Sequence, residues 1–224
     1  MHGRLTRRVE ELCALVRPID SARTTTNLWG ERWSKLCQNG MSNGVSAATG
    51  LTGTDCHRND TIRRFQIQLG GEAVRVGQAL GYQIEKIGKL DPEALARAAE
   101  DDPSALAEVE ALLRPAAGAP ANPRADVQRP SMAQDILKGR RTEIEFMNGY
   151  IAERGRFIGV PAPAHERLTA LVTRVERGEL RAAPQLLGAI AVTLVGALAA
   201  FVARDVVHGA ELGCAGREIG RAHV

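Results

Sequence analysis

The sequence predicts an all-α fold, and three kinds of pattern support this prediction. Apolar residues recur at three- and four-residue steps in several long segments, as they do on the buried face of a helix. Asp-Pro pairs at positions 91–92 and 102–103 place a capping side chain before a proline that suits the first helical position. Thr142 is followed three residues later by Glu145, which is the form of a capping box at a helix start. We therefore expect a helical bundle.

Length and composition are those of a globular protein of one or two domains. The chain has 224 residues, of which 44% are hydrophobic and 25% are charged, so it can bury a sizeable core. Its 29 basic and 26 acidic residues nearly balance, and an aromatic content of 4% offers no stacking platform for bases. We therefore expect no nucleic-acid partner.

The four cysteines lie far apart in the sequence and form no CxxC pair: Cys13, Cys37, Cys56 and Cys214. Such spacing indicates neither a zinc site nor a disulfide framework. We expect no metal ligands and a reduced, cytoplasmic setting.

The chain begins with an amphipathic segment, residues 4–16, in which apolar residues at helical intervals alternate with charged ones. The charges interrupt the apolar residues, so this segment is not a secretion signal. Residues 18–26 lose the periodicity and are expected to form a connection.

A second helix is expected at residues 29–50, and it carries a polar motif. Lys35, Asn39 and Asn43 follow one another at four-residue steps, which keeps them on one slowly drifting face with the outer pair roughly 12 Å apart. Apolar residues between them can pack the other face, so the polar line would face a cleft or solvent. From the spacing alone, a site for a small polar ligand and an ordinary solvated face both stay open.

Residues 60–87 are expected to form another long helix, in which Gly70-Gly71 could introduce a kink. Shorter helices are expected after Asp91 and Asp102. Residues 115–130 are rich in Pro and Ala and are expected to form a connection that borders Ser131.

The capping-box form of Thr142 and Glu145 places Glu143 in the first helical turn, where the helix dipole favours an ionised carboxylate. On this interpretation Glu145 serves the cap. Without further information, Glu143 is an ordinary acid at a helix start.

The end of the chain has two unusual stretches. Residues 186–203 are uncharged and just long enough for a membrane span of about 17 to 25 residues, and we rank a packed apolar helix first and a membrane anchor second. Residues 218–224 can be encoded by DNA that contains the start of a sequencing-library adapter. We therefore interpret the end of the 184–224 tail as technical sequence.

Two separated stretches resemble the C-terminal domain of the ketopantoate reductase (2-dehydropantoate 2-reductase) family. The resemblance extends over about residues 28–180, and each stretch is carried by short motifs in a fixed order. These motifs are Trp33-x-Lys35-Leu36-x-x-Asn39 with Asn43 after it, Ser131-Met132-x-Gln134-Asp135-Ile136, Gly139-Arg140, Thr142-Glu143-Ile144-Glu145, Asn148-Gly149 and Gly159-Val160-x-x-Pro163.

The resemblance implies a fold, an activity and residue roles. The fold is a helical bundle similar to the C-terminal domain of the 6-phosphogluconate dehydrogenase superfamily, and the activity is the NADPH-dependent reduction of ketopantoate to pantoate in pantothenate biosynthesis. Lys35 would act as general acid, and Glu143 would hold the substrate hydroxyl and orient Lys35. Asn39 and Asn43 would position polar groups of the substrate, and Ser131 would contact its carboxylate.

Two departures from the family pattern concern the substrate. Gln128 and Gly53 stand near positions that are often Asn in the family. A related reductase that acts on a different small 2-oxo acid therefore stays open.

The resemblance also implies a division of the chain. Residues 1–27 would be a helix and connection from the end of a missing dinucleotide-binding domain, and residues 28–183 would form the helical domain. No GxGxxG motif occurs in the sequence, so NADPH would be bound mainly by a domain absent from this chain, which alone would be inactive. The sequence leaves a homodimer open.

The alternative function belongs to another class. It is a stand-alone helical interaction module that keeps the scaffold without catalysis, and a membrane tether through residues 186–203 stays open for it.

Overall fold

A computed structural model describes residues 3–115 and 129–188 of the chain. Within these residues all the regular elements are helices, and one isolated bridge pairs Ile87 with Leu90. The all-α prediction is confirmed. The helices are α1 (Arg7–Val16), α2 (Leu28–Thr49), α3 (Gly53–Arg58), α4 (Asp60–Ala79), α5 (Pro92–Ala98), α6 (Pro103–Leu113), α8 (Ser131–Leu137), the π-helix η1 (Glu145–Gly149), α9 (Tyr150–Phe157) and α10 (Pro163–Glu176).

The bundle is built on an antiparallel pair, α2 and α4. Near the start of α2, the indole Nε1 of Trp33 donates to the carbonyl oxygen of Ala73 at 2.9 Å. Further along, Gln66 Nε2 donates to the carbonyl oxygen of Met41 at 3.1 Å. The two contacts fix the position of one helix along the other, although Gln66 Oε1 is buried without a hydrogen-bond partner.

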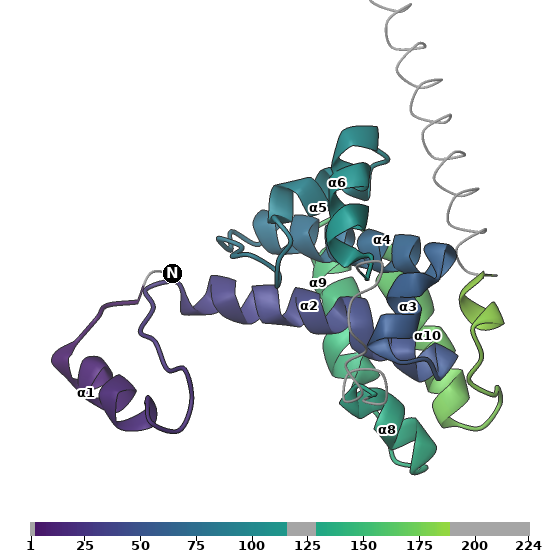
Figure 1. Ribbon diagram of the computed structural model, residues 1–224, viewed down its shortest axis with the longest axis horizontal. Coiled ribbons are helices and arrows are strands. Elements are labelled where there is room, and N and C mark those ends of the chain that lie inside the picture. Colours follow the sequence, from purple (N-terminus) through teal and green to yellow (C-terminus); the bar gives the residue numbers. More distant parts are fainter. Residues whose placement is uncertain (1–2, 116–128, 189–224) are drawn as a thin grey trace, which may run out of the picture.

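The short helices α5 and α6 cover one side of α4, as Figure 1 shows. An added Cβ at Gly70 would lie 2.7 Å from Leu95 Cδ2, so α5 packs directly on the glycine pair. The helix α4 continues through Gly70-Gly71 without a break and ends at Ala79. Close packing of α5 explains the glycines, because any larger residue would push that helix away.

Both predicted aspartate caps are confirmed. The Asp91 carboxylate accepts from the Ala94 amide at 3.0 Å, and Pro92 is the first residue of α5. The Asp102 carboxylate accepts from Ser104 and Ala105 at 2.9 and 3.0 Å, with Pro103 opening α6.

The helices after residue 129 close the other side of the bundle. A buried carboxylate of α4, Glu72, accepts from the backbone amides of Ala164 at 3.0 Å and His165 at 3.3 Å. These amides belong to the first turn of α10, where N–H groups have no partner within the helix. Glu72 therefore joins the start of α10 to α4.

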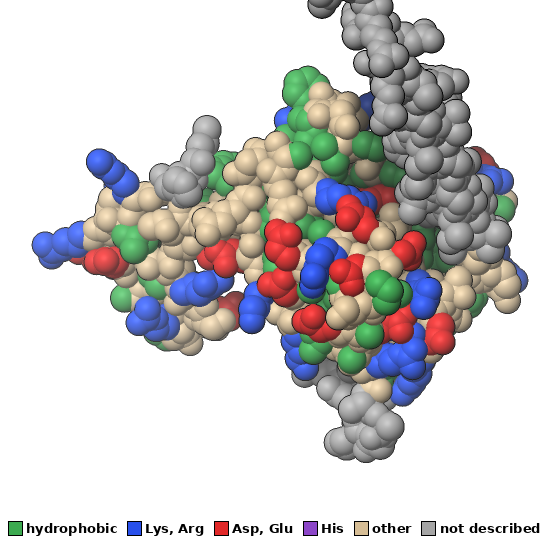
Figure 2. All heavy atoms as spheres, turned by 90° about the horizontal axis from the view of Figure 1, so that it is seen from above, with side chains coloured by type: hydrophobic (Ala, Val, Ile, Leu, Met, Phe, Trp, Pro, Cys, Tyr) green, Lys and Arg blue, Asp and Glu red, His purple; other side chains and the backbone are tan. Residues whose placement is uncertain are grey.

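The first segment of the chain stands apart from the bundle, as α1 does on the left of Figure 1. Only Cys13 of α1 is buried, whereas Leu15 is 72% exposed and Ile19, after the helix, is 85% exposed. The predicted amphipathic helix is confirmed, but its apolar residues are not covered by the described bundle. On the face drawn in Figure 2, basic and acidic side chains are interspersed.

Several sequence predictions lie outside the described residues. They concern Gln128, Cys214, most of the 115–130 connection, most of residues 186–203, and residues 218–224. Among the helices that the structure does describe, none combines the length and the hydropathy that a membrane crossing needs.

Candidate active site

The predicted polar line lies on the open face of α2. Lys35 is exposed, and Asn39 and Asn43 are half-buried. The opposite face is buried in the core through residues such as Cys37 and Val45. The helix therefore separates its apolar and polar faces as the sequence predicted, and its polar residues are accessible to a ligand.

Neighbouring side chains hold parts of this line in place. Lys35 Nζ donates to Gln38 Oε1 at 3.3 Å. The Ser42 hydroxyl lies 3.1 Å from the Gln38 carbonyl oxygen and 3.2 Å from Asn43 Oδ1, and it can donate to only one of them at a time. Asn43 Nδ2 lies 3.8 Å from the sulfur of Met147 in η1, which is a weak acceptor.

Two glycines let η1 and α10 approach α2 beside the polar line. An added Cβ at Gly44 would lie 2.9 Å from Ile144 Cδ1 and 3.0 Å from Leu168 Cδ2. At Gly40 it would lie 3.3 Å from both His165 Cε1 and Ile151 Cδ1. The glycines thus bring the residues that follow Glu143 against the middle of α2.

A buried polar chain fixes this approach. Asn148, which is fully buried within η1, donates through Nδ2 to the Gly40 carbonyl oxygen at 2.9 Å. The same nitrogen lies 3.0 Å from His165 Nδ1, and His165 Nε2 lies 2.8 Å from the Leu69 carbonyl oxygen. A carbonyl only accepts, so Nε2 carries the proton and Nδ1 accepts from Asn148.

The protonation state of His165 agrees with this pattern. Burial lowers the pKa of His165 to about 4, although the hydrogen bond to Leu69 acts in the other direction. The imidazole is therefore neutral near pH 7. Four helical elements (α2, η1, α10 and α4) are linked through one neutral side-chain pair.

Burial has the opposite effect on Glu72, which contacts the same turn of α10. It raises the pKa of Glu72 to about 7, while hydrogen bonds from Ala164, Gln68 and His165 lower it. The carboxyl group thus changes its protonation state near neutral pH. It is enclosed by the protein, so it has a structural role.

The structure corrects the capping-box interpretation. Glu145 forms an ion pair with Arg141 at 2.8 Å and no side chain caps η1. Thr142 instead donates through its amide and hydroxyl groups to Glu176 Oε2 of α10, both at 2.7 Å. A carboxylate in the adjacent helix accepts both bonds, and a local sequence motif does not reveal such a partner.

Glu143 lies immediately before the helical segment rather than inside its first turn. Its carbonyl oxygen accepts from the amides of Phe146 and Met147 at 3.0 and 3.1 Å, and its side chain is exposed. The side chain is therefore accessible at the start of η1, where the amide dipoles favour a carboxylate.

Ser131 is the first residue of α8, which packs against α2, and its side chain is exposed. Both α8 and η1 thus pack against α2; Ser131 lies on α8, the three polar residues lie on α2, and Glu143 lies just before η1. The described residues show no hydrogen bond or ion pair between Lys35 and Glu143. Gly53, the second position that departs from the family pattern, is the first residue of α3. A Cβ added there would have no atom within 4 Å.

Sequence reasoning missed the buried residues that hold the site together. The family motif contains Asn148 without giving it a role, and the sequence patterns predict no role for His165 or Glu72. A signal for His165 exists, because it shares the apolar spacing of Leu168 and Val172 on the buried face of α10. Its partners come from distant segments, so no local pattern predicts them.

The part of the chain that the structure describes contains no group of three or more His, Cys, Asp or Glu residues placed to hold a metal ion.

Comparison with known proteins assigns a family to this arrangement. Residues 27–176 match the family model described as "Ketopantoate reductase PanE/ApbA C terminal". A 2-dehydropantoate 2-reductase of Archaeoglobus fulgidus is 24% identical over 179 residues, which are 80% of this chain and 51% of that protein. One of Pyrococcus horikoshii is 24% identical over 152 residues, or 68% of this chain and 42% of that protein. The chain thus spans about half or less of these relatives.

Solved structures of related proteins have a similar fold over most of this chain. A PanE/ApbA family ketopantoate reductase from Ralstonia eutropha superposes with a TM-score of 0.56 at 28% identity, covering 77% of this chain and 50% of that one. D-mandelate dehydrogenase in complex with NADH has a TM-score of 0.58 at 22% identity, covering 77% of this chain and 51% of that one. The second likeness concerns the fold alone.

Proposed function

The chain belongs to the ketopantoate reductase family through its C-terminal helical domain, and from this we propose that it is the substrate-side part of an NADPH-dependent 2-dehydropantoate 2-reductase. The observation that carries the proposal is the line Lys35, Asn39 and Asn43 on the open face of α2, next to the helix that follows Glu143. Family membership adds the reaction class, and the roles of the residues are argued from their chemistry.

Lys35 is the proposed general acid. Reduction of a ketone places negative charge on its oxygen, and an ammonium group can first donate a hydrogen bond to that oxygen and then a proton. Its present partner, the neutral Gln38 amide, is held by a single contact of 3.3 Å on an exposed surface. A substrate oxygen can replace such a partner at little cost.

The other candidates bind and orient the 2-oxo acid. The Glu143 carboxylate would accept from the substrate hydroxyl and orient Lys35, and the Ser131 hydroxyl would donate to the substrate carboxylate. The side-chain amides of Asn39 and Asn43 contain both a donor and an acceptor. Each can therefore donate a hydrogen bond to the substrate or accept one from it. Gly53, which stands near a position that is often Asn in the family, offers no side chain to a substrate.

The described residues do not suit the binding of most of a dinucleotide. The pyrophosphate turn of such a fold follows a β-strand, and the described residues contain none. NADPH would supply the hydride when it is held mainly by another domain. For this chain we therefore propose only the holding of the 2-oxo acid and the donation of a proton.

The N-terminal segment fits such a partner domain. Residues 1–27 are the proposed end of a dinucleotide-binding domain, and the exposed apolar side chains of α1 and Ile19 would be covered by the rest of it. A stand-alone interaction module would also use these exposed side chains, which is the observation that favours the second candidate function.

One kinetic comparison tests the proposal. The purified chain should not oxidise NADPH in the presence of ketopantoate, whereas a polypeptide that joins it in frame to a dinucleotide-binding domain of the family should. Lys35→Ala and Glu143→Ala should each abolish most of that turnover. If the joined protein binds NADPH but its turnover is unchanged by both substitutions, the proposed roles are wrong.

A further inference from the structure

A hollow with a volume of about 480 Å³ lies where α3 meets the end of α6. Its volume is within the range of sites for small organic molecules, roughly 300 to 1,000 Å³. It shares no residue with the candidate active site. The lining residues are Thr54, His57, Lys89, Ala111, Leu112, Leu113, Arg114 and Pro115.

The wall of this hollow is polar on one part and apolar on another. Lys89 and Arg114 contribute cationic groups, and Thr54 and His57 contribute hydrogen-bonding side chains. The last turn of α6 supplies the apolar part through Leu112 and Leu113, together with Pro115, two residues after the helix. A ligand with a charged head and a short apolar body would match both parts.

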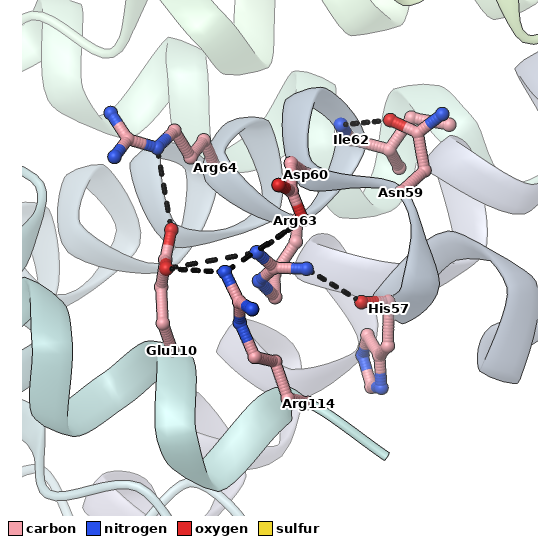
Figure 3. Close-up of polar contacts among 8 residues, drawn as sticks. All are labelled: His57, Asn59, Asp60, Ile62, Arg63, Arg64, Glu110 and Arg114. Carbon is pink, nitrogen blue, oxygen red and sulfur yellow. Dashed lines mark hydrogen bonds and ion pairs between the residues drawn. The ribbon is translucent and has the colours of Figure 1, made fainter. Parts of the chain in front are cut away.

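The hollow is joined through Arg114 to an ion cluster, drawn in Figure 3, in which arginines outnumber carboxylates. Arg63, Arg64 and Arg114 face only two carboxylates, Asp60 and Glu110. One positive charge is therefore not balanced within the cluster. Lys89, which lines the hollow from the loop before α5, adds a second positive charge.

Arg63 keeps this excess charge close to the hollow. It is 1% exposed, and its guanidinium donates to the His57 carbonyl oxygen at 2.9 Å and to Asp60 Oδ1 at 2.7 Å. A buried guanidinium stays protonated, because the pKa of arginine is too high for burial to neutralise it. The charge is thus a permanent feature of the fold.

Arg114 can reach a ligand without leaving the cluster. Its Nη2 lies 3.3 Å from Glu110 Oε2 and 3.8 Å from Asp60 Oδ1, and both contacts use that one nitrogen. A guanidinium has five N–H groups, so it can contact a carboxylate in the cluster and an anion in the hollow together.

The His57 side chain would contribute a neutral donor. Burial, and then the nearby charge of Arg63, lower the pKa of His57 from its ordinary value. Its ring is therefore neutral near pH 7 and still has one N–H group for a ligand oxygen.

We propose that this hollow is a second binding site, which takes a small organic anion by its charged head between Lys89 and Arg114 and places its apolar body against the end of α6. Among the residues that the structure describes, none of those that line the hollow is a carboxylate, and the two carboxylates of the adjoining cluster are already shared among three arginines. The same charges disfavour a cation of equal size.

The test uses the whole chain and three probes with the same apolar body: butyl phosphate, 1-butanol and butylamine. Binding is followed by backbone amide NMR shifts of the residues that line the hollow. Butyl phosphate should give saturable shifts at Thr54, His57 and Lys89, and the other two probes should give none. Lys89→Gln and Arg114→Gln should each weaken binding about threefold, as expected for partly exposed charges.

Lys86→Gln is the matched control, because Lys86 is exposed on the same loop and does not line the hollow. It should leave the affinity for butyl phosphate unchanged. Equal shifts with butanol, absence of saturable shifts, or an affinity that Lys89→Gln and Arg114→Gln leave unchanged would each overturn the proposal. None of these results depends on the reductase function.

Discussion

The side-chain amide of Asn148 donates a 2.9 Å hydrogen bond to the backbone carbonyl oxygen of Gly40. Gly40 lies on α2 between Asn39 and Asn43, and Asn148 lies in the π-helix that follows Glu143. This single contact therefore sets the position of one half of the candidate site relative to the other. A π-helix at such a place is a feature often found at functional sites.

Replacing Asn148 should destabilise the fold. Asn148→Ala removes the bonds to Gly40 and His165 and leaves the buried Nδ1 of His165 without its donor. We expect the free energy of unfolding to fall by about 2 to 3 kcal/mol in urea titrations. Asn59→Ala, which removes only the exposed cap of α4, should cost about 1 kcal/mol. Equal losses for both variants would contradict the role given to Asn148.

Some helix boundaries were predictable because local patterns determine them, but the helix expected at residues 60–87 was predicted too long: α4 ends at Ala79, and Gly81 follows with a positive φ of 82°. The prediction of residues 29–50 compares with Leu28–Thr49 in the structure, and both Asp-Pro caps formed as expected. The capping box at Thr142 failed because Glu176, 34 residues away in the sequence, accepts both bonds from Thr142. A partner from another helix is decided by packing, which the local motif does not contain.

The glycines of α2 give a second test of how the site is assembled. Gly44→Ala would place a methyl group 2.9 Å from Ile144 Cδ1 and 3.0 Å from Leu168 Cδ2; these are the ends of flexible side chains and alanine favours the helix, so we expect a net change within about 1 kcal/mol. Gly44→Leu is too large for small shifts of these ends, so we expect a loss of about 1 to 3 kcal/mol. Gly53→Leu, at a position with no atom within 4 Å of an added Cβ, should stay within about 0.5 kcal/mol. Thermal unfolding separates the cases, and a neutral Gly44→Leu would show that Ile144 and Leu168 do not pack closely on α2 there.

The pH dependence of stability should reveal two opposing groups. His165 has a pKa of about 4 in the folded chain against 6.5 for a free side chain, so the unfolded chain binds more protons between these values and stability rises with pH. Glu72 has a pKa of about 7 against 4.5, so the folded chain binds more protons and stability falls with pH. Between pH 4.5 and 6.5 the two effects nearly cancel.

Single substitutions should expose each effect. Relative to the unsubstituted chain, Glu72→Gln should gain stability by about 2 to 3 kcal/mol as pH rises from 4.5 to 6.5, and His165→Asn should lose a similar amount. Urea titrations at the two pH values measure the difference, and other titrating groups cancel in the comparison. Parallel pH profiles for both variants would contradict the assigned protonation states.

The sequence predicts which residues share a helix face, but it does not predict how the residues of separate helices lie relative to one another. The four-residue steps from Lys35 to Asn43 identify one helix face, and the structure confirms that this face is open. The spacing contains nothing about Glu143, which follows about a hundred residues later and was chosen from the family resemblance. Its relation to α2 depends on glycine contacts and on Asn148, which long-range packing determines.

The most direct test of the account is the binding of ketopantoate to the purified chain, measured by isothermal titration calorimetry. We predict saturable binding that Lys35→Ala weakens at least about tenfold, or ~1.4 kcal/mol, while the exposed-lysine control Lys86→Ala leaves it unchanged. Binding that is equally strong in Lys35→Ala and in the unsubstituted chain would contradict the proposal that the polar face of α2 holds the substrate.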